Sequence, residues 1–188
     1  MGEDVTSASE RFLGLLRPIE RELEVYCRRL AFDSRDVPDA IQNAVLRAYR
    51  AFDRYHDDAS FRAWMFKILT NEVFAINRKR GRISKFEVPV ETEELESFAG
   101  SEPGFAPTDL MSSWEALADA LDQDVVAALE ALNESERAVL LLRAIGGLRY
   151  REVSASLEIP LGSVMGHLHR ARQKMRDAIL RARRRSAT

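Results

Sequence analysis

The chain has 188 residues, of which 46% are hydrophobic, and it contains few glycines and prolines. This composition predicts a folded, helical protein with one domain or two small ones. No apolar run is long enough to cross a membrane and the N-terminal sequence has no signal-peptide pattern, so we expect a cytoplasmic protein with no membrane insertion of its own. Cys27 is the single cysteine, which excludes an internal disulfide and fits a reducing cytosol.

The net charge of −2 conceals a strong asymmetry along the chain. Residues 1–85 carry +3 (16 basic, 13 acidic), residues 86–136 carry −14 (no basic, 14 acidic) and residues 137–188 carry +9 (12 basic, 3 acidic). Two basic parts therefore flank an acidic connection, and this pattern predicts polyanionic partners for both ends. Our hypothesis for the acidic connection is that it shields these ends from random binding to nucleic acid.

Two helices are predicted before the first polar loop. Apolar residues recur at three- and four-residue steps over residues 9–32, where Pro18 marks a break or a second start. After a turn at residues 33–38, Asp39 is predicted to cap a helix over residues 40–55. The spacing gives this helix an apolar side made of Ile41, Val45, Leu46, Tyr49 and Phe52.

A third helix is predicted after a polar loop at residues 56–59. Ser60 is the expected cap of this helix, and Gly81 is a suitable C-terminal stop. Basic residues cluster at the end of the helix, from Arg78 to Lys85. Cations suit the negative end of a helix, but five of them exceed what capping needs, so contact with phosphate is a second interpretation.

Residues 83–112 have the prolines, glycines and scattered acids of a linker. Helical spacing returns over residues 113–131, and a further helix is predicted over residues 134–144, opened by Asn133 or Ser135 and closed at Gly146-Gly147. The basic tail at residues 181–188 is expected to fray.

Residues 147–172 have the pattern of a helix-turn-helix. Pro160 pushes Ile159 out of helical geometry, so the first short helix stops there and Ile159 can fill the angle between the two helices. Ser163 or Gly162 is the expected cap of the second helix. Apolar residues four apart give each helix one buried face, Val153 with Leu157 and Val164 with Leu168. Cations follow, as in a major-groove reader; the alternative is an ordinary helix pair with a solvated basic face.

No pattern of residues supports catalysis. The sequence contains no grouping of nucleophile and base, no glycine loop for a phosphate and no convincing pair of carboxylates. Three histidines and one cysteine do not make a metal site, since His167 and His169 point to different sides of a helix. We therefore expect no enzyme activity, no cofactor and no metal.

Two blocks of the sequence resemble a known family. Asp36 to Arg82 is similar to region 2, and Leu132 to Ile179 to region 4, of bacterial sigma factors of the extracytoplasmic-function (ECF) type. The resemblance implies an all-α fold with two small helical domains, a region 2 bundle and a region 4 helix-turn-helix, joined by a flexible acidic linker. The implied boundaries are 9–82 for region 2, 83–112 for the linker and 113–182 for region 4, with the helix-turn-helix at about 149–170.

The resemblance also implies a function, which is to bind core RNA polymerase and direct promoter-specific transcription initiation. Region 2 would dock on the polymerase through Asp39, Gln42, Asn43, Arg47, Arg50 and Asp53. It would also recognise and melt the minus-ten element, where a flipped base enters a pocket beside the polar loop. The residues implied for this are Ser60, Phe61, Trp64, Lys67, Asn71, Arg78, Lys79 and Arg80, although the spacing of Phe61 and Trp64 favours a core position.

Region 4 would read the minus-thirty-five element. The residues implied are Arg149, Ser163, Met165, Gly166, His167, His169, Arg170, Arg172 and Lys174. The chain departs from the family at Met165, Gly166 and His167, where two cations are lost and a glycine weakens the helix by up to about 1 kcal/mol relative to alanine. Arginine readout of guanine is absent at position 165, so we predict an atypical minus-thirty-five sequence or a greater reliance on the minus-ten element.

The family resemblance further implies an anti-sigma partner. Two other interpretations stay open. One is a helix-turn-helix regulator that binds DNA through residues 132–180 without docking on polymerase, and the other is an interaction module that titrates an anti-sigma factor.

Overall fold

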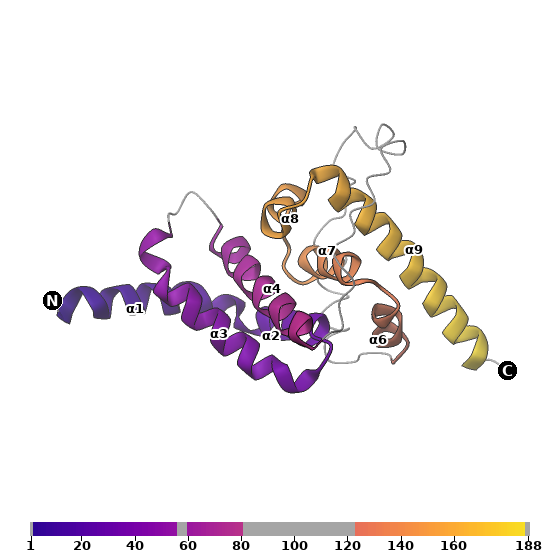
Figure 1. The fold of residues 1–188 in the computed structure, drawn as a ribbon, viewed down its shortest axis with the longest axis horizontal. Helices are drawn as coiled ribbons and strands as arrows, with labels where there is room; N and C mark the ends of the chain where they lie inside the picture. The colour runs from indigo at the N-terminus through magenta and orange to yellow at the C-terminus, as the bar shows by residue number, and fades with distance from the viewer. Residues whose placement is uncertain (1, 56–59, 81–122, 187–188) are drawn as a thin grey trace. The chain divides into compact units, whose positions relative to one another are not determined.

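The computed structural model describes residues 2–55, 60–80 and 123–186 (Figure 1). Regular structure in these ranges is entirely helical, which confirms the predicted all-α fold. The chain divides into two compact units, Met1–Arg82 and Ile83–Thr188, and each has its own apolar core. Among the described residues, none of the helices has the length and hydropathy of a membrane span.

Pro18 divides the N-terminal helical segment of the first unit. Pro18 lies in the 3-10 turn η1, where its ring fixes φ and separates the helix before it from the helix after it. The predicted interruption is therefore confirmed. The elements of this unit are α1 (Gly2–Leu16), η1 (Arg17–Ile19), α2 (Glu20–Leu30), η2 (Ser34–Asp36), α3 (Val37–Arg50), η3 (Phe52–Arg54) and α4 (Phe61–Lys79).

The core of the first unit forms where α2, α3 and α4 pack against one another. Its centre contains a buried polar pair: the Tyr26 hydroxyl lies 2.6 Å from Thr70 Oγ1, which in turn donates to the Phe66 carbonyl at 2.6 Å. The Tyr26 and Phe66 rings meet edge to face, with centroids 5.1 Å apart. Because both hydroxyls have partners, burying them does not carry the cost of an unsatisfied polar group. Cys27 is also buried, as a small core residue.

The helix α3, which was predicted over residues 40–55, differs from its prediction at both ends. It begins at Val37 rather than residue 40, so Asp39 lies in its first turn and is not the cap. It ends at Arg50, and the 3-10 turn η3 follows. The predicted apolar side is wrong for Leu46 and Tyr49, which are 46% and 39% exposed.

Ser60 caps α4 as predicted, because its Oγ accepts a hydrogen bond from the Ala63 amide at 3.3 Å. The polar loop at residues 56–59 and the predicted stop at Gly81 lie outside the described residues.

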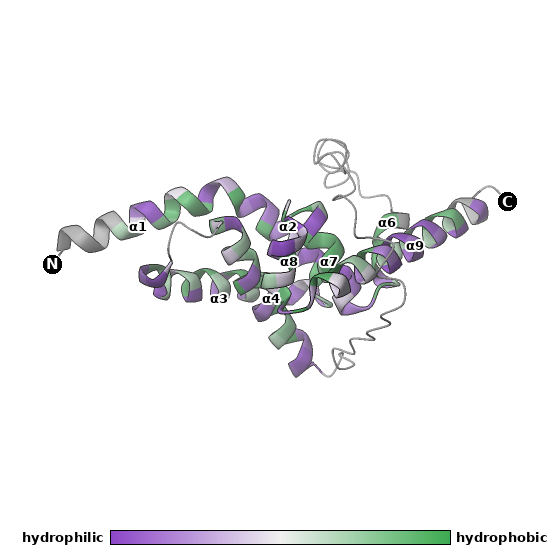
Figure 2. Cartoon of the chain, turned by 90° about the horizontal axis from the view of Figure 1, so that it is seen from above, coloured by the Kyte–Doolittle hydropathy of each residue, from purple (hydrophilic) through white to green (hydrophobic). Residues whose placement is uncertain are grey.

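In the second unit, α9 is the helix on which the others pack. It contacts α6, α7 and α8, and hydrophilic and hydrophobic residues alternate along it (Figure 2). The elements are α6 (Gln123–Glu130), α7 (Glu134–Ala144), α8 (Tyr150–Leu157) and α9 (Leu161–Ser186). The tail that we expected to fray is therefore helical as far as Ser186. The predicted linker and residues 113–122 of the predicted helix lie outside the described residues.

Both ends of α7 follow local sequence rules. Asn133 is its cap: Oδ1 accepts from the Glu136 amide at 2.8 Å, and Glu136 Oε2 accepts from the Asn133 amide at 3.2 Å, which is a capping box. The helix closes before Gly147, whose φ of +63° lets the Leu148 amide turn back to the Leu142 carbonyl at 3.1 Å.

The helix-turn-helix forms from α8 and α9. As predicted, α8 stops before Pro160 and Ile159 is buried in the angle between the helices. Glu158 makes the turn with a left-handed φ of +56°. The predicted cap at Gly162 or Ser163 is wrong, because α9 already begins at Leu161 and the Val164 amide donates to the Pro160 carbonyl.

Candidate functional site

The outward side of α3 presents a polar stripe with an apolar centre. Asp39, Gln42, Asn43 and Arg50 are exposed, and their spacing of three, four and seven residues puts them on one face of the helix. Leu46 lies in the middle of this face. We call these five residues the α3 stripe. Asp53 is exposed just beyond it in η3.

Sequence reasoning missed Leu46 because it assumed that an apolar residue at helical spacing faces the core. The available signal was its position three or four residues from both Gln42 and Asn43. An exposed leucine surrounded by polar groups is suited to a protein interface.

Arg47 lies beside the α3 stripe but has a partner inside the unit. Its guanidinium pairs with the carboxylate of Glu72 from α4, a side chain that is only 12% exposed. Arg47 therefore ties α3 to α4 and neutralises a shielded charge.

A groove of about 800 Å³ lies between α2 and the start of α3. Its walls include Leu23, Val37 and Ile41, and two members of the α3 stripe, Asp39 and Gln42, line it as well. The groove is therefore continuous with the α3 stripe.

One face of α4 combines an aromatic side chain with polar and cationic ones. Trp64, Lys67, Asn71 and Arg78 are three, four and seven residues apart, so they lie along one side of the helix. Asn71 and Arg78 are exposed, while Trp64 and Lys67 are half-buried. We call these four residues the α4 stripe. Lys79 is exposed beside it, and Ser60 is committed to capping the helix.

Phe61 belongs to the core and not to the surface. It is 7% exposed, and its ring packs edge to face on Phe12 and Tyr55 with centroids 5.9 and 5.5 Å apart. A base cannot stack on a ring that is covered, so the expected DNA contact at Phe61 is not compatible with this position. Trp64 remains accessible, and its ring lies 5.1 Å from that of Tyr55. Sequence reasoning did not include Tyr55 in this site. Its position as an aromatic residue directly before the polar loop could have indicated it.

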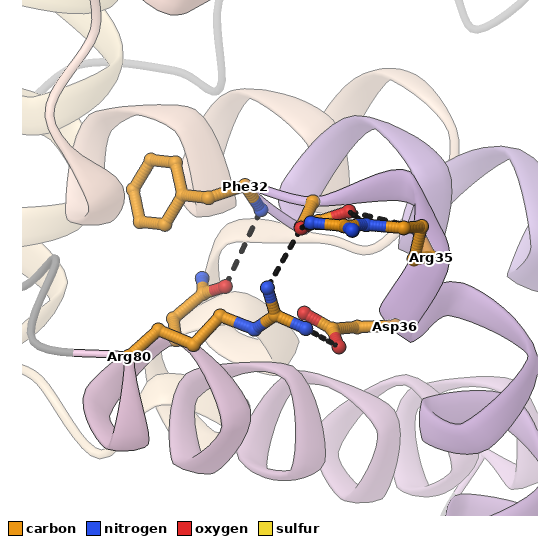
Figure 3. Close-up of polar contacts among 6 residues, drawn as sticks. Phe32, Arg35, Asp36 and Arg80 are labelled. Atoms are coloured by element: carbon orange, nitrogen blue, oxygen red, sulfur yellow. Dashed lines mark hydrogen bonds and ion pairs between the residues drawn. The ribbon is translucent and has the colours of Figure 1, made fainter.

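Arg80 differs from its neighbours Arg78 and Lys79. Its guanidinium binds two carboxylates, Asp33 and Asp36, in the connection between α2 and α3 (Figure 3).

The outward face of α9 carries Leu161, Met165, His169 and Arg172. Their spacing of three and four residues aligns them along one side of the helix, and Leu161 is 38% exposed. We call these four residues the α9 stripe. Leu161 was not predicted; the signal for it was a leucine directly after Pro160, in the first turn of the helix.

Another side of α9 faces a buried carboxylate on α7. Glu136 is 1% exposed, and Lys174 Nζ lies 2.9 and 2.8 Å from its two oxygens. Arg170 Nε lies 3.7 Å from the same carboxylate. Two of the cations expected to bind DNA therefore neutralise Glu136.

His167 lies on the same side of α9 as Arg170 and Lys174, three and seven residues before them, and only 2% of it is exposed. An Arg170 nitrogen lies 3.2 Å from its Nδ1. A guanidinium can only donate, so Nδ1 accepts and the neutral ring carries its proton on Nε2, which is buried with no hydrogen-bond partner among the described residues. Burial, together with the charge of Arg170, lowers the pKa of His167. The expected DNA contact at His167 is thus incompatible with its position, since the ring is covered.

Gly166 makes room for the Arg170 guanidinium beside His167. A Cβ added at position 166 would lie 3.3 Å from a terminal nitrogen of Arg170. The glycine therefore leaves room for the guanidinium to lie along the helix toward His167. The departure from the family pattern at Gly166 and His167 therefore belongs to the packing of α9 on α7, whereas Met165 lies on the α9 stripe.

The remaining residues predicted in this unit are Arg149 and Ser163. Arg149 is exposed at the start of α8, where its amide donates to Glu152 Oε2 at 2.6 Å. Ser163 is half-buried in the first turn of α9. Within the described ranges, no three metal-binding side chains gather in one place.

Comparisons with known proteins identify the family of this chain. Residues 12–83 match the family described as sigma-70 region 2, and residues 122–175 match the family described as sigma-70 region 4. The ECF RNA polymerase sigma-E factor of Escherichia coli K12 is 32% identical over 148 residues, which are 78% of this chain and 75% of that protein. The ECF RNA polymerase sigma factor SigE of Mycolicibacterium smegmatis is 32% identical over 149 residues, 79% of this chain and 54% of that protein.

Two solved structures share the fold. The sigma factor RpoE of Bartonella quintana, in complex with the anti-sigma factor NepR, has a TM-score of 0.67 at 21% identity and covers 90% of this chain and 97% of its own. CnrH, in complex with the cytosolic domain of CnrY, has a TM-score of 0.61 at 24% identity, with 96% and 94% covered. The chain belongs to the sigma-70 family as an ECF RNA polymerase sigma factor, an alternative sigma factor that directs transcription initiation and is not an enzyme.

Proposed function

We propose that the α3 stripe docks this sigma factor on core RNA polymerase and that the α4 and α9 stripes bind the two promoter elements. The observation that carries the proposal is that three helices each present an aligned outward stripe whose chemistry differs from the other two. Leu46, with polar neighbours around it, suits a protein interface in which one apolar anchor is sealed by a polar rim.

The α4 stripe has the chemistry needed to hold an unpaired strand. Trp64 offers a stacking surface, Asn71 offers an amide for a base edge, and Arg78 and Lys67 offer charge for phosphates. We therefore assign the minus-ten element to this stripe, with Lys79 as an additional phosphate contact.

The α9 stripe supports an unusual reading of the minus-thirty-five element. Leu161 and Met165 offer apolar contact, for which the methyl group of thymine is the matching feature of the major groove. Arg172 and His169 are exposed on this stripe, and they offer a cation for a base or a phosphate and a ring nitrogen for a hydrogen bond. Arg170 and Lys174 bind Glu136. An element richer in thymine than in guanine follows from this arrangement.

We infer that an anti-sigma protein controls this chain. One similar solved structure is the sigma factor RpoE in complex with the anti-sigma factor NepR, and another is CnrH in complex with the cytosolic domain of CnrY. The groove between α2 and α3 supports the inference, because a partner seated in it would also cover Asp39 and Gln42 of the α3 stripe. We place the protein in the cytoplasm, where core polymerase and chromosomal DNA are found.

The experiment that tests the proposal is transcription in vitro with purified core polymerase, the protein and a library of randomised promoters. We expect specific transcripts that require the protein, with both promoter elements readable from the selected sequences. No transcript combined with specific DNA binding by the protein alone would identify a helix-turn-helix regulator. Absence of both activities would leave a module that titrates an anti-sigma factor.

A further inference from the structure

The C-terminal end of α4 holds the connection between α2 and α3 through Arg80 (Figure 3). One terminal nitrogen of Arg80 donates to Asp33 Oδ2 at 2.7 Å, and the other donates to Asp36 Oδ1. We call this arrangement the Arg80 clasp. It joins residues more than forty positions apart in the sequence, so it fixes the tertiary position of the connection and not only its local shape.

Arg35 holds the Asp33 carboxylate in place independently of Arg80. Its Oδ1 accepts from the Arg35 amide and the Arg35 Nε, both at 3.0 Å, and its Oδ2 accepts from an Arg35 terminal nitrogen at 2.7 Å. The side-chain hydrogen bond from Arg35, followed by the one from its backbone, holds the pKa of Asp33 well below its usual range. This carboxylate therefore stays charged for Arg80 at any pH at which the protein works.

The clasp is more shielded than an ordinary surface ion pair. The Asp33 and Asp36 side chains are 12% and 15% exposed, and Arg80 is 37% exposed, whereas Arg35 on the outer side is 81% exposed. Water and salt screen a pair in such a position less than a fully solvated one.

A second bond reinforces the clasp from the last turn of α4. The Asn77 side chain is buried, and its Oδ1 accepts from the Phe32 amide at 3.3 Å. The end of α4 thus holds this connection both at Phe32 and at the two aspartates.

Asp36 is the residue from which α3 starts, since it occupies the position directly before Val37. The α3 stripe begins three residues later, at Asp39. We propose that Arg80 is a positioning residue, which sets the start of α3 and thereby the α3 stripe for the polymerase, and that it does not contact promoter DNA. The inference rests on the proposed docking of α3 on the polymerase.

Two observations argue against a contact between Arg80 and DNA. Both of its terminal nitrogens already donate to carboxylates, so a phosphate would have to displace two charged acceptors at once. Arg80 also follows Arg78 by two residues, which on a helix turns it away from the α4 stripe. Arg78 has no ion pair among the described residues and is the matched control.

The first test compares Arg80→Ala with Arg78→Ala in the full chain, by titrating each labelled protein with core polymerase in the absence of DNA. We expect Arg80→Ala to weaken polymerase binding about tenfold, because the charge-assisted bonds to Asp33 and Asp36 that fix the start of α3 are lost. We expect Arg78→Ala to bind polymerase like the wild type. Arg80→Lys is expected to fall between them, because an ammonium lacks the fork that spans two carboxylates. At saturating polymerase, Arg80→Ala should open a promoter at the wild-type rate, whereas Arg78→Ala should be slow.

The second test reads the clasp without polymerase. Hydrogen exchange of the peptides that cover residues 33–43 should accelerate in Arg80→Ala and stay unchanged in Arg78→Ala, with thermal unfolding confirming that both variants are folded. Wild-type polymerase affinity in Arg80→Ala, or an opening defect equal to that of Arg78→Ala, would overturn the inference. Failure of the wild type to bind polymerase overturns the docking proposal and with it the role of Arg80 in docking, while the exchange result still decides whether Arg80 sets the start of α3.

Discussion

Lys174 in α9 neutralises the buried carboxylate of Glu136 in α7, with its ammonium 2.9 and 2.8 Å from the two carboxylate oxygens. Glu136 also completes the capping box of α7, so one carboxylate both starts that helix and fixes α9 against it. This arrangement fixes α9, the helix proposed to read the promoter, relative to α7.

Replacing Lys174 should therefore destabilise the second unit. Lys174→Ala leaves the buried carboxylate with Arg170, 3.7 Å away, as its one remaining cation among the described residues, so we expect the free energy of unfolding to fall by about 1–3 kcal/mol. Arg176→Ala is the matched control, because Arg176 and its partner Asp177 are both largely exposed and such pairs contribute about 0–1 kcal/mol. Chemical denaturation measures both variants, and equal losses would contradict the role given to the Lys174–Glu136 pair.

His167 should make the stability of this unit depend on pH. Burial and the charges of Arg170 and Lys174 lower its pKa in the folded state, against the opposing effect of Glu136. The unfolded chain then binds more protons than the folded one as the pH falls below about 6.5, so the stabilisation is complete above that value and is lost as the pH falls through the lower, folded pKa.

The measurement is denaturation of the wild type and of His167→Gln at about pH 7.5 and about pH 5.5. We expect the loss of stability toward acid to be smaller in His167→Gln than in the wild type. An equal loss of stability toward acid in His167→Gln and in the wild type would contradict the assignment.

Leu46 should matter for polymerase binding and not for folding. Leu46→Gln removes the apolar centre of the α3 stripe, and we expect the Kd for core polymerase to rise about tenfold while the unfolding midpoint stays within error. Leu13→Gln is the control, since Leu13 is similarly exposed on α1. Binding is measured by titration with core polymerase, and an equal effect of the two substitutions would exclude a specific role for Leu46.

Met165 should limit the contacts that α9 makes with DNA. Met165→Arg adds a cation in the α9 stripe, so we expect tighter promoter binding, a salt dependence steeper by about 0.9 in the log–log slope for each phosphate gained, and selection for guanine at one position. Leu180→Arg adds the same charge at an exposed site near the end of α9. Promoter selection should change for Met165→Arg and stay as in the wild type for Leu180→Arg.

Local sequence rules predicted much of the fold. Pro18 and Pro160 end helices because their rings fix φ and remove a donor, and Ser60 and Asn133 cap helices through bonds to amides three residues away. Each of these effects depends on neighbours in the sequence, so the sequence alone is sufficient to predict it.

Contacts between distant residues account for what sequence reasoning missed. Asp36 rather than Asp39 precedes α3, in a connection that Arg80 holds from more than forty residues away. Lys174 binds Glu136 and His167 is buried because α7 packs on α9, which periodicity along α9 cannot reveal. Leu46 is exposed although its helical spacing predicted burial, since apolar side chains also make up much of a protein's surface.

The contact between Trp64 and Tyr55 gives the protein an intrinsic fluorescent reporter of strand capture. The chain has two tryptophans, so Trp114→Phe leaves Trp64 as the sole indole emitter. A nucleobase stacked on Trp64 would quench its emission, and a half-buried indole beside a phenol already has an environment sensitive to displacement of either ring. Promoter opening could then be followed in real time with unmodified DNA and no attached dye.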